Sequence, residues 1–260
     1  MADQTPIERL NLFGPAFKAE AYAVYARLRA EAPVLRRANR NGPGATCFIT
    51  RYEDAVAVLR DAKRFVKDVR NSMTPEQRVV FAPDPPLMRL LSHHMLNSDA
   101  PDHTRLRGLV NQAFTTRMVE QLHGRIETIA HDLLGTVAAQ RSADLIAAYA
   151  LPLPIIVIAD LLGVPSRDYH RVRAWSNALV APNADSARSA KKLAKAGALM
   201  EDFIAYLRAI FAARRAKPRD DLISSLLAAE EAGDVLSENE LFSMILLLIV
   251  VGHETTVNLI

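Results

Sequence analysis

The feature that most constrains the fold is an apolar run close to the C-terminal end of the sequence. It reads LFSMILLLIVV, from Leu241 to Val251, and its serine is the one polar residue in it. The preceding Ser237-Glu238-Asn239-Glu240 has the Ser-x-x-Glu pattern of a capping box, which predicts that a helix begins there. The run is well short of the roughly 20 apolar residues that cross a bilayer. We therefore expect the central core helix of a globular protein and no membrane span.

Helical periodicity dominates the rest of the chain. Residues 16–32 place apolar and charged side chains on opposite faces of a helix. Two short β-like segments, 33–38 and 45–50, flank the turn sequence NRNGPG, which indicates a hairpin. From residue 101 onward the pattern is almost entirely helical. The expected fold class is mainly α with a small N-terminal β-sheet.

Composition limits the classes of function and location. The net charge of +3 on 260 residues is small, so we expect no nucleic-acid partner. The single cysteine, Cys47, rules out an internal disulfide and fits a reducing cytoplasm. The N-terminal stretch MADQTPIERLNL lacks the pattern of a signal peptide. We expect a cytoplasmic monomer.

The segment NSDAPDHTRLRGLVNQAF, residues 97–114, is the first candidate for chemistry. Ser98, Asp99 and Pro101 predict a helix start. His103 and Arg107 are four residues apart, so they share one helical face and can both donate hydrogen bonds to an anion. The alternative is a solvated helix face whose charges are balanced by a neighbouring acid.

The second candidate is the polar sequence GHETT, which follows the apolar run. Glycine inside a helix costs about 1 kcal/mol against alanine, so Gly252 needs a reason, such as the close approach of a flat group or a local widening of the helix. Thr255 can turn its hydroxyl back to the carbonyl of Val251. Glu254 and Thr255 could then deliver protons as an acid–alcohol pair. The alternative is that His253 and Glu254 simply face solvent.

Together the two segments resemble one protein family. DAPDHTRLRGLVNQAFT resembles the C-helix motif of bacterial cytochrome P-450 monooxygenases, and VVGHETT resembles their I-helix motif. The intervening stretches, 151–180 and 217–241, are similar to the same family in the same order. The resemblance implies a cytochrome P-450 fold, with residues 1–260 forming a single truncated domain. Its parts would be an N-terminal helix and hairpin region (1–67), a loop (68–99) and a helical region (100–260).

The resemblance also implies roles for individual residues. The cofactor would be haem b, iron protoporphyrin IX, with His103 and Arg107 holding its propionates. Gly252 would let the last helix pass close to the haem, and Glu254 and Thr255 would relay protons during dioxygen activation. Val251 stands where alanine or glycine is usual. The expected pocket for substrate is lined by Leu87, Met88, Leu91, Met95 and Val251.

The implied activity is insertion of one oxygen atom of dioxygen into a C–H bond of a largely apolar small molecule, in secondary metabolism. A ferredoxin-type donor with its NAD(P)H reductase would supply electrons, with Arg105 or Arg117 on the docking surface. The family's Glu-x-x-Arg motif and axial cysteine are expected beyond Ile260, so this fragment alone is expected to be inactive. Cys47 is not that ligand and is expected to be a small buried residue of the hairpin. The alternative is a haem-free helical scaffold.

Overall fold

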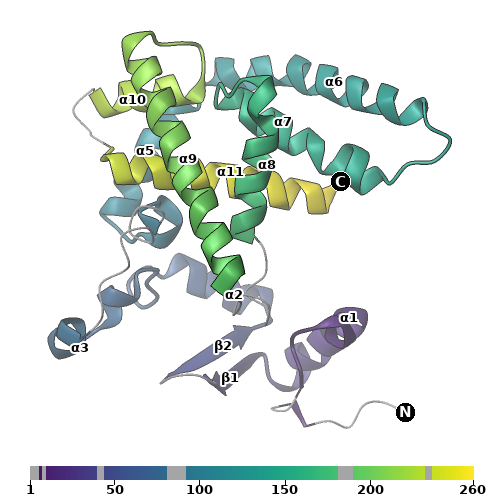
Figure 1. Cartoon of the computed structure of the whole chain (residues 1–260). Helices are drawn as coiled ribbons and strands as arrows, with labels where there is room; N and C mark the ends of the chain where they lie inside the picture. The colour runs from purple at the N-terminus through teal and green to yellow at the C-terminus, as the bar shows by residue number, and fades with distance from the viewer. Residues whose placement is uncertain (1–5, 8–9, 40–43, 81–91, 181–189, 232–235) are drawn as a thin grey trace. The chain divides into compact units, whose positions relative to one another are not determined.

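The computed structural model describes residues 6–7, 10–39, 44–80, 92–180, 190–231 and 236–260 (Figure 1). Helices account for most of these residues, and the β structure is one two-stranded antiparallel sheet. The predicted fold class, mainly α with a small N-terminal sheet, is confirmed.

The elements follow the order that the sequence pattern predicts. In the first part of the chain they are α1 (Pro15–Glu31), β1 (Val34–Ala38), β2 (Ala45–Ile49) and α2 (Tyr52–Arg60). They continue with the short helices η2 (Val69–Ser72), α3 (Pro75–Val80) and η3 (Met95–Asn97), then α5 (Asp102–Ala113), α6 (Thr116–Ala138) and η4 (Ile146–Ala150). The last are α7 (Pro152–Leu161), η5 (Ser166–Asp168), α8 (Tyr169–Val180), α9 (Ala190–Ala216), α10 (Leu222–Glu231) and α11 (Glu238–Leu259).

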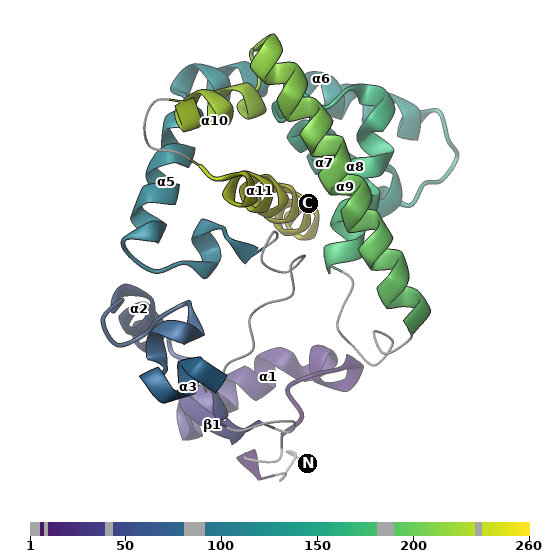
Figure 2. The same cartoon turned by 60° about the vertical axis from the view of Figure 1, so that its left-hand side comes forward.

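The apolar run forms the middle of the core, as expected. Every residue from Leu241 to Leu247 is buried, and Figure 2 shows α11 surrounded by α5, α10 and the group α7–α9. The capping box is present: the Glu240 amide donates to Ser237 Oγ at 3.3 Å, and the Ser237 amide donates to Glu240 Oε2 at 2.7 Å. Among the described helices α11 alone is long and apolar enough to cross a membrane, but half of the tested stretch is buried inside the protein. This burial is what a soluble core helix would also show.

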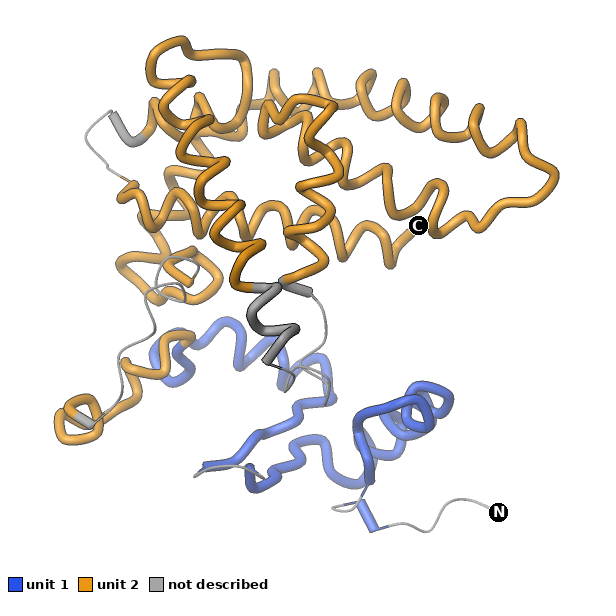
Figure 3. The backbone as a smooth tube through the Cα atoms, in the orientation of Figure 1, with its two compact units in different colours: residues 1–66 blue, residues 67–260 orange. Residues whose placement is uncertain are grey.

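The chain divides into two compact units, Met1–Val66 and Lys67–Ile260 (Figure 3). In the first unit the β1–β2 hairpin pairs Leu35 with Phe48 and Arg36 with Cys47, and Leu35 joins a small core with Leu28. Cys47 lies on the other face of the hairpin from Leu35 and is exposed, so the expectation that it is buried is wrong. The single-domain prediction stays a prediction.

Candidate functional site

Helix α5 carries the first motif in the second unit. Leu106, Leu109 and Val110 bury one side of this helix in the main core. His103 is half-buried and Arg107 is exposed, both on α5. Within the part of the chain that the structure describes, neither side chain makes a hydrogen bond, although the charge of His103 acts on the nearby Asp99 carboxylate and helps to lower the pKa of Asp99. Their donors are therefore available to an anion.

Arg105, the third cation of this segment, has a structural role. Its guanidinium forms an ion pair with Glu240 in the first turn of α11, which ties the N-terminal end of that helix to α5. Burial alone would raise the pKa of Glu240, but hydrogen bonds from the Ser237 amide and Arg105 outweigh burial and lower it. Arg105 is thus held in an ion pair but stays partly exposed, and its place on a docking surface stays a prediction.

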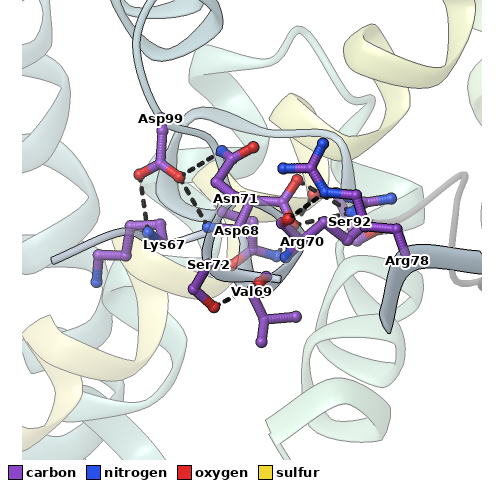
Figure 4. Close-up of polar contacts among 10 residues, drawn as sticks. Lys67, Asp68, Val69, Arg70, Asn71, Ser72, Arg78, Ser92 and Asp99 are labelled. Atoms are coloured by element: carbon purple, nitrogen blue, oxygen red, sulfur yellow. Dashed lines mark hydrogen bonds and ion pairs between the residues drawn. The ribbon is translucent and has the colours of Figure 1, made fainter. Parts of the chain in front are cut away.

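The helix start predicted from Ser98, Asp99 and Pro101 is confirmed, since α5 begins at Asp102. The Asp99 carboxylate does not cap α5. It accepts the backbone amides of Lys67 at 2.8 Å and Asp68 at 3.0 Å and the side-chain amide of Asn71 at 2.8 Å (Figure 4). These bonds, that from the Lys67 amide first, lower the pKa of Asp99. The turn before α5 is thus fastened to residues 67–71, which are distant in sequence.

The last turns of α11 carry the second motif. Thr255 is exposed, and its hydroxyl donates to the Val251 carbonyl at 2.6 Å, which confirms the back-bond predicted from sequence. Val251 is 47% exposed on the same side of the helix. Glu254 is half-buried. The helix is a regular α-helix through Leu259, so the local widening considered for Gly252 is absent from α11.

Gly252 lies where α11 approaches α7. A Cβ atom at this position would stand 3.5 Å from Cδ1 of Ile158, an ordinary van der Waals distance. The close neighbour of this glycine in the structure is therefore a helix of the same chain, and its role beside a flat cofactor stays a prediction.

His253 is the residue that sequence reasoning missed. The residue is 5% exposed, and its Nδ1 lies 2.9 Å from Oγ of Ser176, a fully buried residue of α8. Burial lowers the pKa of His253; Glu254 opposes this shift and Arg173 adds to it. The alternative in which His253 faces solvent is wrong. The sequence did not indicate the contact between His253 and Ser176, because the two residues are 77 positions apart.

Of the five residues expected to line the substrate pocket, Met95 and Val251 belong to the described part of the chain. Leu87, Met88 and Leu91 lie outside the described residues. Met95 lies in η3, half-buried against the main core. A separate groove of about 800 Å³ runs along α5, lined by Ala100, Pro101, Thr104, Arg105, Gly108, Leu109 and Gln112. It includes none of the predicted site residues, so it is not the candidate site.

Comparison with known proteins identifies the family, although no model of a protein family matches the chain. The chain belongs to the bacterial cytochrome P-450 family. It is 42% identical to a polyketide-biosynthesis cytochrome P-450 of Bacillus subtilis over 250 residues, covering 95% of this chain and 60% of the relative. It is 40% identical to a cytochrome P-450 monooxygenase of Streptomyces venezuelae over 258 residues, covering 98% of this chain and 58% of that protein.

The fold agrees with the sequence comparison. A solved myxobacterial cytochrome P-450, in complex with myristic acid, superposes on this chain with a TM-score of 0.80 and is 44% identical in sequence. The superposition covers 95% of this chain and 60% of the solved chain. The chain thus spans about 60% of the length of the curated relatives it matches. The two motif segments therefore lie on the helices of a cytochrome P-450 fold.

Proposed function

We propose that the protein to which this sequence belongs is a haem-dependent monooxygenase that inserts one oxygen atom of dioxygen into a C–H bond of a largely apolar small molecule. The observation that carries the proposal is the pairing of two features. On α5, the side chains of His103 and Arg107 make no hydrogen bond to another described residue, and on α11 the exposed Thr255 has its hydroxyl bonded to the Val251 carbonyl. The names of the relatives, a monooxygenase among them, support the same activity.

The residues present fit a haem b group. Its two propionates are anions, and His103 and Arg107 offer donors that no described residue occupies. Arg105 on the same helix is already paired with Glu240, so the fit is specific to these two positions. Bound haem would supply the activation of dioxygen. The axial cysteine thiolate would come from the part of the protein that corresponds to the rest of the relatives' length; Cys47 has no such role.

Thr255 and Glu254 would handle protons. The Thr255 hydroxyl donates its proton to the Val251 carbonyl, which leaves its oxygen lone pairs free to accept a hydrogen bond. Passing a proton onward requires the hydroxyl to leave that carbonyl and turn outward. Glu254 is the neighbouring residue, about 100° around the helix, so a water molecule would have to connect the two side chains. In this arrangement Glu254 delivers protons and Thr255 directs them.

Substrate and partners follow from the same proposal. The relatives act in polyketide biosynthesis or bind a fatty acid, by their names, and we propose a substrate of comparable apolar character in secondary metabolism. A ferredoxin-type donor with its NAD(P)H reductase would supply electrons, with partly exposed Arg105 on α5 or exposed Arg117 on α6 on its docking surface. The proposed location is the cytoplasm, and the proposed state is a monomer.

The role of Thr255 is testable in a completed chain, in which this sequence is followed by the remaining part of the Bacillus subtilis relative. We expect Thr255→Ala to keep haem content but to divert most of the oxygen consumed into peroxide, because the protons are no longer directed. The measurement is product formed per dioxygen consumed. The matched control is Thr128→Ala, which removes the same kind of back-bond, to the Gly124 carbonyl of α6, away from the site. Equal coupling in both variants would refute the role of Thr255.

A further inference from the structure

A buried polar contact joins α11 to α8 directly behind the proposed proton-delivery turn. His253 Nδ1 and Ser176 Oγ are 2.9 Å apart, with the two residues 5% and 0% exposed. The helices α8 and α11 are separated in the sequence by α9 and α10. A hydrogen bond between two groups this well buried is retained only where it satisfies atoms that water cannot reach.

The contact lies opposite the exposed side of the turn. His253 is two residues from both Val251 and Thr255, which places its side chain about 160° to 200° around the helix from theirs. The exposed side carries Val251 and Thr255, whereas the buried side is held by Ser176 of α8. One residue earlier, Gly252 packs toward Ile158 of α7. The turn is therefore fixed from behind by two helices.

The chemistry of the ring assigns its tautomer. Nε2 is buried and has no hydrogen-bond partner among the described residues. A buried N–H without a partner is rarer in proteins than a bare acceptor atom. The proton therefore belongs on Nδ1, where it is donated to Ser176 Oγ, and Nε2 is left as a bare acceptor. A neutral ring with its proton on Nδ1 restrains the direction of the side chain, because the Nδ1–H can donate to Ser176 Oγ in one orientation of the ring only.

We propose that His253 is a positioning residue: its hydrogen bond to Ser176 fixes the rotation of the last turns of α11 and so sets the direction in which Glu254 and Thr255 point. The effect of this orientation on proton delivery rests on the proposed function. The hydrogen bond between the two buried side chains does not depend on that function. Helix α8 would then determine how the proton-delivery turn is oriented.

The test is hydrogen exchange of the 250–259 peptide, followed by mass spectrometry, in the haem-loaded completed chain. Ser176→Ala should speed exchange in this peptide about five- to tenfold, the equivalent of one typical hydrogen bond, and leave the other helices of the second unit unchanged. The matched control is Ser225→Ala in α10, which removes a hydroxyl bonded to the carbonyl of Asp221, the residue just before that helix. His253→Asn, whose amide can donate from near the position of Nδ1, should restore slow exchange compared with His253→Phe.

Coupling of oxygen consumption to product provides the second readout. It should fall in Ser176→Ala and His253→Phe and recover in His253→Asn, at unchanged haem content. Unchanged exchange in Ser176→Ala overturns the inference, and so does faster exchange spread over the whole second unit, which would indicate a merely structural contact. Failure of the proposed function is distinguishable: Thr255→Ala would then leave coupling intact, while the exchange result would still report on the restraint.

Discussion

At the scale of single residues, the buried cluster of Gly163, Arg214 and Asp221 joins an ion pair to a backbone turn that requires glycine. Gly163, which follows α7, has φ of +71°, and a Cβ there would collide with the Asp221 carboxylate. Arg214 joins the two, donating from Nε to Asp221 at 2.5 Å and from Nη2 to the Gly163 carbonyl at 2.8 Å. Arg214 and Asp221 are 6% and 5% exposed. The end of α7 is thereby fastened to the junction of α9 and α10.

Gly163→Ala should destabilise the protein by about 2 kcal/mol or more, because it adds both a left-handed strain and a collision with Asp221. Urea unfolding measures the change. Gly124→Ala in α6 is the control: nothing lies within 4 Å of the added methyl group, so it should be neutral or stabilising by up to about 1 kcal/mol. Equal effects at the two glycines would contradict this reading of Gly163.

His253 should make stability depend on pH. Its pKa in the folded protein is below the ordinary value of 6.5, so the unfolded chain binds the proton more readily. The contribution is complete above pH 6.5 and is lost as the pH falls below that value toward the lower folded pKa. The midpoint of urea unfolding should therefore decrease over this range, and His253→Asn should flatten that part of the profile. An unchanged profile in His253→Asn would show that the ring is not buried in its neutral form.

At the scale of elements, local patterns predicted more than long-range ones. The capping box of α11, the β1–β2 hairpin and the Thr255 back-bond are all set by residues within a few positions of each other, and all are confirmed. The helix start predicted from Ser98, Asp99 and Pro101 is confirmed by α5, but the bonds of the Asp99 carboxylate were not predicted, because its partners, Lys67 to Asn71, are about thirty positions away. His253 with Ser176 and Arg105 with Glu240 escaped prediction for the same reason.

Asp99→Ala should loosen residues 67–72 without affecting α11, because one carboxylate satisfies two backbone amides and an Asn side chain there. We expect several-fold faster hydrogen exchange in a peptide covering this segment. Asp102→Ala, three residues along and exposed, is the control and should leave the segment unchanged. No difference between the two variants would mean that the bonds to Asp99 do not hold the segment.

At the scale of the whole molecule, the resemblance in two short motifs located the family, and the fold comparison agrees with it. Periodicity alone predicted a mainly helical fold with a central apolar helix, but it gave no indication of a cofactor. The roles of His103, Arg107, Gly252, Glu254 and Thr255 came from the resemblance. The structure adds that the side chains of His103 and Arg107 make no hydrogen bond to another described residue, and that His253 near the end of α11 lies 2.9 Å from Ser176 of α8.

The most direct test of the central claim, that α5 and α11 carry one half of a haem site, is a haem titration of the completed chain. We predict stoichiometric haem binding and, after reduction with carbon monoxide present, the difference band of a thiolate-ligated haem. His103→Ala combined with Arg107→Ala should release haem at least tenfold faster, because each charge-assisted bond to a propionate contributes about 1.5–3 kcal/mol. Arg117→Ala, an exposed cation of α6, should retain haem. A folded completed chain that binds no haem, or a double variant that retains haem as well as the parent, would contradict the account and favour a haem-free helical scaffold.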